Sequence, residues 1–200
     1  MKKIIHYNLE ILSAVMLIII TITAVFQTDI SLVRRLILGF MALYTLHEWE
    51  EGRIPGGFYD LLFGRIGVQY KNDPDLIHMP VAIYLFVILL VPYFFDSAPL
   101  LLLPPLCLAL FEGFIHTMGI IMMKCKKPYT PGMLTAWIMF VYAVWCIHQL
   151  PDLGTMTWVE GALLTVVTFV IMQRCVIGLA AIRTEYCFLW QRKTYLENNR

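Results

Sequence analysis

The stretch Leu32–Arg53, LVRRLILGFMALYTLHEWEEGR, is a long apolar run that ends in a group of ionisable side chains. Its length matches the roughly 20 residues that a membrane-crossing helix needs. Residues three and four positions apart share one face of a helix, so His47, Glu50 and Glu51 lie on one side. Glu48 points elsewhere. An imidazole and two carboxylates at or just inside a membrane boundary are costly without a partner, and metals, protons or buried cations suit them.

A second pair of the same kind lies within the apolar run Leu100–Met123. Glu112 and His116 are four positions apart and share a helix face. This pair reads Glu-x-x-x-His, whereas His47 and Glu51 read His-x-x-x-Glu. If the two faces meet, two imidazoles and at least two carboxylates converge, and these are ligands that suit zinc, iron or manganese.

The composition indicates an integral membrane protein. Hydrophobic residues make up 60% of the chain and charged residues 14%, whereas a soluble domain is about half apolar and about a quarter charged. The length fits one domain, residues 1–200. The net charge of +1 and the lack of a basic block interleaved with aromatics give no reason to expect a nucleic-acid partner. The five cysteines form no C-x-x-C pair, which favours reduced thiols over disulfides.

We predict an all-α fold, a polytopic integral membrane helix bundle of about six spans with both termini in the cytoplasm. A polar loop, 52–78, follows the second span and contains a short interfacial helix near 58–70. A polar C-terminal tail covers residues 183–200. The predicted spans are residues 7–27, 32–51, 79–95, 99–123, 132–150 and 156–181.

The distribution of charge supports this orientation. Most lysines and arginines then face the cytoplasm, and the outer turns contain Asp29, Asp96 and Asp152 but no lysine, as the positive-inside rule expects. Arg34 and Arg35 are the exception. The two His/Glu pairs both fall in the inner leaflet, at broadly matching depth. We therefore expect a bacterial-type inner or cytoplasmic membrane protein whose site faces the cytoplasmic side.

Three motifs taken in order resemble those of the HXXEE family of small membrane proteins. They are the run His47-x-x-Glu50-Glu51, the later His116, and Tyr129-Thr130-Pro131-Gly132. The similarity extends from about Gly39 to Ala136. It implies a multi-span membrane protein of uncharacterised function, so it supports the site without naming a substrate.

The Tyr-x-Pro-Gly motif has mainly structural explanations. Pro131 suits the first turn of the following helix, Thr130 can cap that helix, and Gly132 permits tight packing. A functional alternative is that the hydroxyl of Tyr129 binds a lipid head group or a water on a metal.

The leading hypothesis is a membrane-embedded metalloenzyme, for example a metallohydrolase, that acts on a lipid or another hydrophobic small molecule. His47, Glu51, Glu112 and His116 are the candidate ligands of a divalent metal, zinc or alternatively iron. Glu50 is the candidate general base.

Other interpretations remain open. His47, Glu51 and Glu112 loosely resemble the residues of membrane sterol isomerases, which implies metal-independent proton shuttling on a sterol-like lipid. The same residues suit a small cation or proton carrier, and a non-catalytic membrane partner would need none of them. The plainest alternative is a solvated helix end at His47, with Arg53 as ion-pair partner. The sequence does not indicate the substrate or the oligomeric state.

Overall fold

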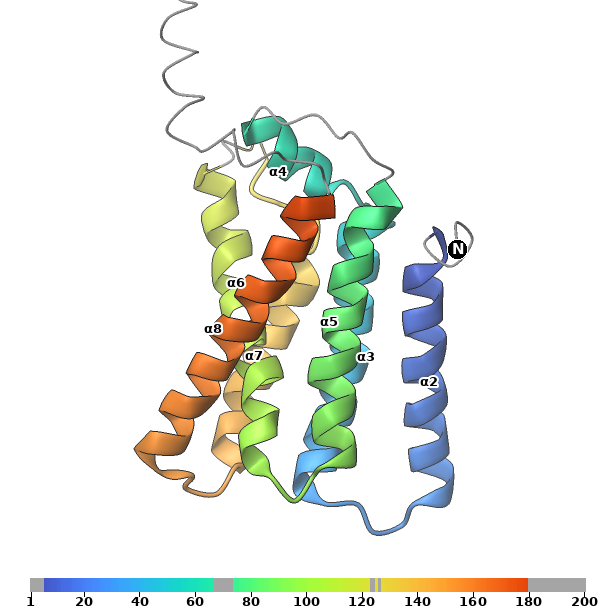
Figure 1. Ribbon diagram of the computed structural model, residues 1–200, viewed down its shortest axis with the longest axis vertical. Helices are drawn as coiled ribbons and strands as arrows, with labels where there is room; N and C mark the ends of the chain where they lie inside the picture. Colours follow the sequence, from blue (N-terminus) through green and yellow to red (C-terminus); the bar gives the residue numbers. More distant parts are fainter. Residues whose placement is uncertain (1–5, 67–73, 123–124, 126, 180–200) are drawn as a thin grey trace, which may run out of the picture.

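The computed structural model describes residues 6–66, 74–122, 125 and 127–179. Within these residues the regular structure is entirely helical, as predicted, and contains no strand. Figure 1 shows the long helices running side by side, with the short helix α4 across one end of the bundle. The elements are α2 (Asn8–Phe26), α3 (Leu32–Gly52), α4 (Phe58–Ile66), α5 (Pro74–Phe94), the 3-10 helix η1 (Pro99–Leu102), α6 (Leu103–Met122), α7 (Met133–Gln149) and α8 (Gly154–Leu179).

The six long helices correspond to the six predicted spans. By length and composition, three segments within the described residues could cross a membrane: Asn8–Phe26, Pro99–Met122 and Gly154–Gly178. The apolar parts of α5 and α7 are shorter, and α3 carries charged residues near both ends. These findings fit an integral membrane protein. The count of six spans and the cytoplasmic placement of the termini stay predictions, and the tail 183–200 lies outside the described residues.

Helix α3 lies at the centre of the bundle. It packs against α2, α5 and α7, and its apolar residues Leu36, Ile37, Phe40 and Met41 have 0% exposure. Helix α2 lies at the edge, and α8 runs obliquely across α5 and α6 (Figure 1). Because α3 is the most enclosed helix, ionisable side chains near its end are carried into the interior.

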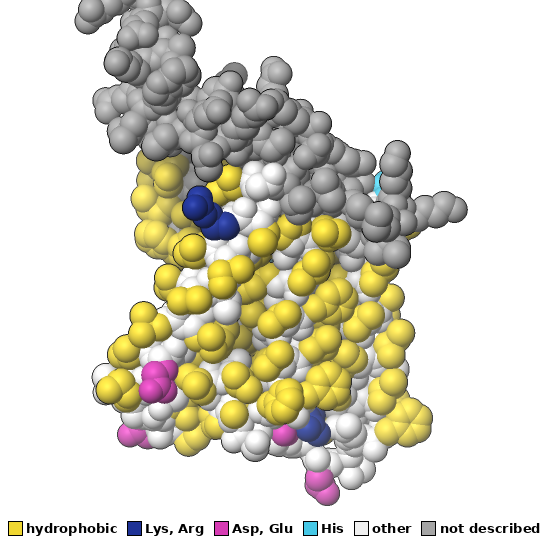
Figure 2. All heavy atoms as spheres, viewed as in Figure 1, with side chains coloured by type: hydrophobic (Ala, Val, Ile, Leu, Met, Phe, Trp, Pro, Cys, Tyr) yellow, Lys and Arg dark blue, Asp and Glu magenta, His cyan; other side chains and the backbone are white. Residues whose placement is uncertain are grey.

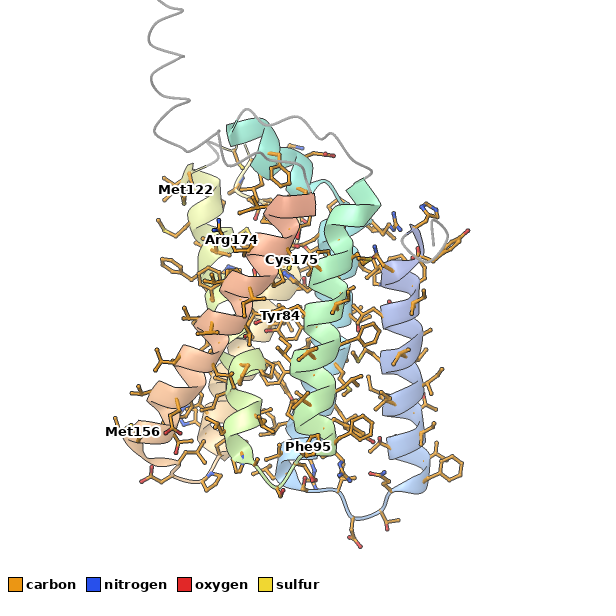
Figure 3. All side chains as sticks on the ribbon, in the orientation of Figure 1. Tyr84, Phe95, Met122, Met156, Arg174 and Cys175 are labelled. Carbon is orange, nitrogen blue, oxygen red and sulfur yellow. The ribbon has the colours of Figure 1, made fainter. Side chains whose placement is uncertain are left out.

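The face drawn in Figure 2 is covered mainly by apolar side chains, and its acidic side chains gather at the end opposite α4. Figure 3 shows that side chains fill the space between the helices, with Tyr84 lying between α5 and α8. Residues near both ends of the bundle, such as Met122 and Phe95, are exposed by 61% and 62%. An apolar belt of this extent is typical of a surface that contacts lipid.

Helices α6 and α8 run in the same direction, and two of their contacts share one register. Gly161 packs on Leu103, and the rings of Phe111 and Phe169 are 5.4 Å apart, so contacting residues differ by 58 in number (161 − 103 and 169 − 111). On the other side of α6, a Cβ at Gly113 would lie 2.8 Å from Cβ of Phe140 on α7. Small residues let membrane helices approach closely, and Gly113 permits such an approach between α6 and α7.

An ion pair explains one of the two arginines that broke the charge rule. Nη2 of Arg34 lies 3.3 Å from Oδ2 of Asp96, and Nε of Arg34 donates to the carbonyl oxygen of Tyr93. The backbone N–H of Arg34 also donates to the hydroxyl of Ser31, which caps α3. The charge of Arg34 is therefore neutralised where the start of α3 meets the turn that follows α5. Arg35 is exposed.

Candidate metal centre

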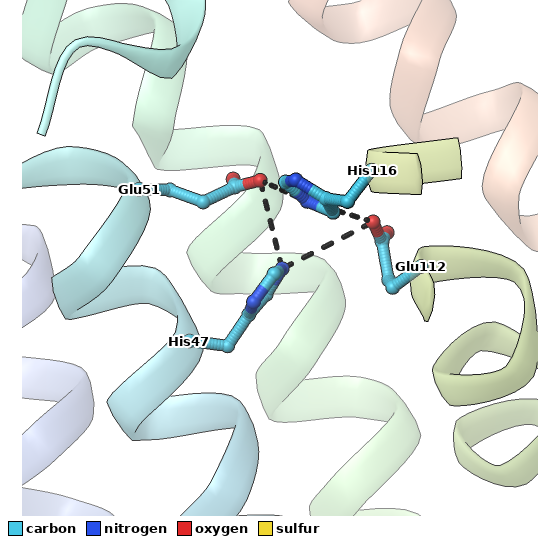
Figure 4. A group of neighbouring side chains, drawn as sticks. All are labelled: His47, Glu51, Glu112 and His116. Atoms are coloured by element: carbon cyan, nitrogen blue, oxygen red, sulfur yellow. Dashed lines mark ion pairs between the residues drawn. The ribbon is translucent and has the colours of Figure 1, made fainter. Parts of the chain in front are cut away.

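Two imidazoles and two carboxylates converge between α3 and α6, as the two sequence pairs predicted. His47 and Glu51 come from α3, and Glu112 and His116 come from α6 (Figure 4). One ligand atom from each residue lies within 4.8 Å of the others. Nε2 of His47 is 3.5 Å from Oε1 of Glu51 and 4.0 Å from Oε2 of Glu112. Nε2 of His116 is 2.9 Å and 3.6 Å from the same two oxygens.

These separations suit a common ion. Metal–nitrogen and metal–oxygen bonds of about 2.0–2.2 Å in tetrahedral geometry place neighbouring ligand atoms roughly 3.3–3.6 Å apart. The measured contacts, 2.9 to 4.0 Å, bracket that value. In addition, the buried Nε2 of His116 has no hydrogen-bond partner among the described residues, although Glu51 is close. A buried imidazole nitrogen that faces two carboxylates without a hydrogen bond fits a metal ligand.

The hydrogen bonds of the other ring nitrogens determine the tautomers. Nδ1 of His47 lies 3.1 Å from the carbonyl oxygen of Gly132, which can only accept, so this nitrogen carries the proton. The hydroxyl of Thr130 donates its proton to the carbonyl oxygen of His116. Its oxygen can therefore accept from Nδ1 of His116, 3.0 Å away, which places the ring proton on Nδ1. Both Nε2 atoms therefore present a lone pair to the centre, as metal-binding histidines do.

The carboxylate of Glu50 points toward the start of α7 and not into the converging group. Its carboxylate accepts hydrogen bonds from the hydroxyl of Tyr129, the backbone N–H groups of Leu134 and Thr135, and the hydroxyl of Thr135. It therefore satisfies the free N–H groups in the first turn of α7. Because both of its oxygens are engaged, Glu50 ties the start of α7 to α3, and it does not belong to the converging group.

Tyr129 is linked to the site through Glu50. Its hydroxyl lies 2.7 Å from Oε1 of Glu50, and its side chain is part of the connection between α6 and α7. Partial burial and this hydrogen bond raise the pKa of Tyr129 above its usual value. The hydroxyl is therefore protonated at neutral pH and acts as a donor to Glu50.

The rest of the Tyr-Thr-Pro-Gly motif holds the two histidines. Gly132 has φ +89°, and a Cβ there would lie 2.6 Å from Cγ of Glu51 and 2.7 Å from Cε1 of His116.

The predicted cap role of Thr130 is wrong, because Gly132 precedes α7 and the Thr130 side chain forms a hydrogen bond with His116 instead. Sequence reasoning missed Thr130 and Thr135 as partners of the histidines. Their place in and beside the motif was the only available signal.

The site is enclosed. The side chains of His47, Glu51 and His116 are 3%, 8% and 0% exposed, whereas that of Glu112 is 17% exposed. The ring of Phe58, at the start of α4, covers His116 with a centroid distance of 4.9 Å. A solvated helix end at His47 is therefore contradicted.

Arg53, suggested as a partner within that helix end, turns away from the site. Its Nη2 lies 3.4 Å from Oε1 of Glu10 on α2. The positive charge of Arg53 is thus directed toward α2, and the converging group consists of imidazoles and carboxylates only.

A family model described as "Protein of unknown function with HXXEE motif" matches residues 38–146, more than half of the chain. The chain belongs to this HXXEE family. The matched region of the HXXEE protein contains all four converging residues and the segment 129–135 that positions them. No curated protein and no solved structure matches the chain.

Proposed function

We propose that the HXXEE protein is an integral membrane metalloprotein whose His47, Glu51, Glu112 and His116 bind one divalent metal ion. The observation that carries this proposal is the convergence of four ligand atoms within 4.8 Å. The protonated Nδ1 atoms of both histidines add support, because they direct both Nε2 lone pairs to the same point. Two imidazoles and two carboxylates suit zinc, and they suit iron equally if the chemistry is oxidative.

We further infer that the ion serves a reaction on a lipid or another hydrophobic molecule. The site lies inside a bundle with an apolar exterior, and such an exterior favours a substrate dissolved in the membrane. A bound divalent ion would supply Lewis-acid chemistry there. We place this site on the cytoplasmic side of the membrane, on the strength of the charge distribution.

Among the four ligands, Glu112 is the candidate to leave the metal when substrate binds and to act as general base in this reaction. It has the longest contacts to the histidines and the most exposed side chain of the four. Catalytic zinc sites commonly use three protein ligands and leave one position for water or substrate. His47, Glu51 and His116 would then be the permanent ligands. The Glu50 carboxylate, which accepts from Tyr129, Leu134 and Thr135, would keep them in position.

Metal analysis of the purified full-length chain tests the proposal. We expect about one zinc or iron ion per chain in the wild type and loss of at least about tenfold in affinity for His47→Ala and His116→Ala. His148→Ala is the matched control, because this histidine is exposed near the end of α7 and lies outside the converging group. A protein that purifies without metal and binds none on titration would contradict the proposal.

One observation favours a second function, a metal-independent isomerase of a sterol-like lipid. The 2.9 Å contact between Nε2 of His116 and Oε1 of Glu51 brings an imidazole and a carboxylate close enough to exchange a proton through a small movement. This alternative expects activity that survives chelation, whereas the metalloenzyme loses activity with its ion.

A further inference from the structure

A buried carboxylate on a neighbouring face of α3 is not among the converging ligands of the metal site. Glu48 is 8% exposed and lines a small pocket between α2, α3 and α5. Within the described part of the chain its carboxylate makes no hydrogen bond or ion pair. An unpaired buried carboxylate is costly, so this pocket calls for a group that complements it.

The polar lining of the pocket has both signs of charge. Asn8, at the start of α2, is 9% exposed, and Arg53 and His78 complete the polar part with Glu48. The Arg53 side chain is 31% exposed; its Nη2 pairs with Glu10 and donates to the carbonyl oxygen of His6, and its planar set of five donors suits a phosphate as well. A carboxylate inside and a guanidinium at the outer edge favour a ligand that carries a cation and an anion close together.

The small size of the pocket favours one type of cationic group in the ligand. The interior has room for about one water-sized group. A primary ammonium fits this space and can donate three hydrogen bonds, whereas a quaternary ammonium is larger and donates none. The amide of Asn8 can accept one of those bonds beside the carboxylate of Glu48.

The location of the pocket favours a lipid as the ligand. Asn8 is the first residue of a segment long and apolar enough to cross a membrane, so the pocket lies at a membrane boundary under the predicted topology. The buried side chains of Leu9, Leu12 and Ala82 form its apolar lining, and Tyr7, just before α2, and Ile11 on α2 are exposed by 51% and 40%. An acyl chain can follow the exposed side chains of Tyr7 and Ile11 away from the polar pocket.

We propose that the pocket between α2, α3 and α5 binds phosphatidylethanolamine, with its ammonium at Glu48 and Asn8 and its phosphate at Arg53 and His78. The four converging residues of the metal site do not line this pocket, so the lipid site is distinct from the metal site.

Native mass spectrometry of the full-length chain in detergent tests this proposal with phosphatidylethanolamine, phosphatidylcholine and phosphatidylglycerol. We expect the wild type to bind one phosphatidylethanolamine at least about tenfold more tightly than the other two lipids. We expect Glu48→Gln to weaken that binding about tenfold to a hundredfold, as loss of a charged hydrogen bond implies. Glu160→Gln is the control, because Glu160 is an exposed acid on α8 outside the pocket.

Several results would overturn the lipid site. Equal binding of the three lipids, or wild-type binding by Glu48→Gln, excludes the proposed recognition. Free ethanolamine that competes as well as the lipid would indicate a site for soluble amines instead. If Glu48→Gln fails to fold, as judged by its helical circular dichroism, the proposal is tested by the lipid preference of the wild type alone.

Discussion

Nε2 of His116 lies 2.9 Å from Oε1 of Glu51, yet it has no hydrogen-bond partner among the residues that the structure describes. The hydrogen bonds of the Thr130 hydroxyl to Nδ1 and to the carbonyl oxygen of His116 fit a ring proton on Nδ1, which makes Nε2 an acceptor. Two acceptors therefore face each other in a buried place. Such an arrangement is stable only with a proton or a metal ion between them, and the predictions below test which parts of the chain maintain it.

Replacing Gly132 with alanine should disrupt both the fold of the connection and the metal site. A Cβ would approach Cγ of Glu51 to 2.6 Å, and the φ of +89° disfavours any residue with a side chain by roughly 1–2 kcal/mol. We expect a lower thermal midpoint and weaker zinc binding. Gly178→Ala is the control, since a Cβ there meets no atom within 4 Å. Equal behaviour of the two variants would refute this role for Gly132.

Thr130→Val should weaken metal binding without unfolding the protein. The change removes the oxygen that accepts from Nδ1 of His116, and loss of such a partner typically lowers metal affinity about 10- to 100-fold. Zinc titration by calorimetry measures the effect. Thr117→Val serves as control, because the hydroxyl of Thr117 bonds only to the carbonyl oxygen of Gly113 in its own helix. The interpretation fails if both variants bind zinc like the wild type.

Glu50→Gln should reduce stability more than it reduces metal content. Glutamine can accept at one oxygen only, so it cannot satisfy Tyr129, Leu134 and Thr135 together. We expect a loss of about 1–3 kcal/mol in unfolding free energy, with near-stoichiometric metal retained. Tyr129→Phe, which removes one of these donors, should show a smaller loss. A Glu50→Gln protein with wild-type stability but no catalytic turnover would instead support the general base predicted from sequence.

The ion pair of Arg34 and Asp96 should couple the two turns at the end of the bundle opposite α4. The side chains are 25% and 21% exposed, so the pair is partly screened and should contribute about 1 kcal/mol. A double-mutant cycle with Arg34→Met and Asp96→Asn, followed by denaturant unfolding, measures the coupling. Arg35→Met is the control, because Arg35 is exposed. A coupling near zero would show that the pair only neutralises charge.

The sequence by itself determined the helices and which residues share a helix face. Apolar length predicted the six long helices, and α-helical periodicity put His47 with Glu51 and Glu112 with His116. The family motifs likewise mark residues of the site, and the family match is confirmed. These inferences succeed because they depend on spacing within one helix.

Only the tertiary structure decided which neighbours those faces meet. Glu50 shares a face with His47, yet the start of α7 supplies its donors from 79 to 85 positions along the chain, and these draw its carboxylate away from the converging group. Thr130 binds His116 instead of capping α7 for the same reason. Helical spacing gives the direction in which a side chain points, but the hydrogen-bond partner that the side chain meets depends on which helices pack together.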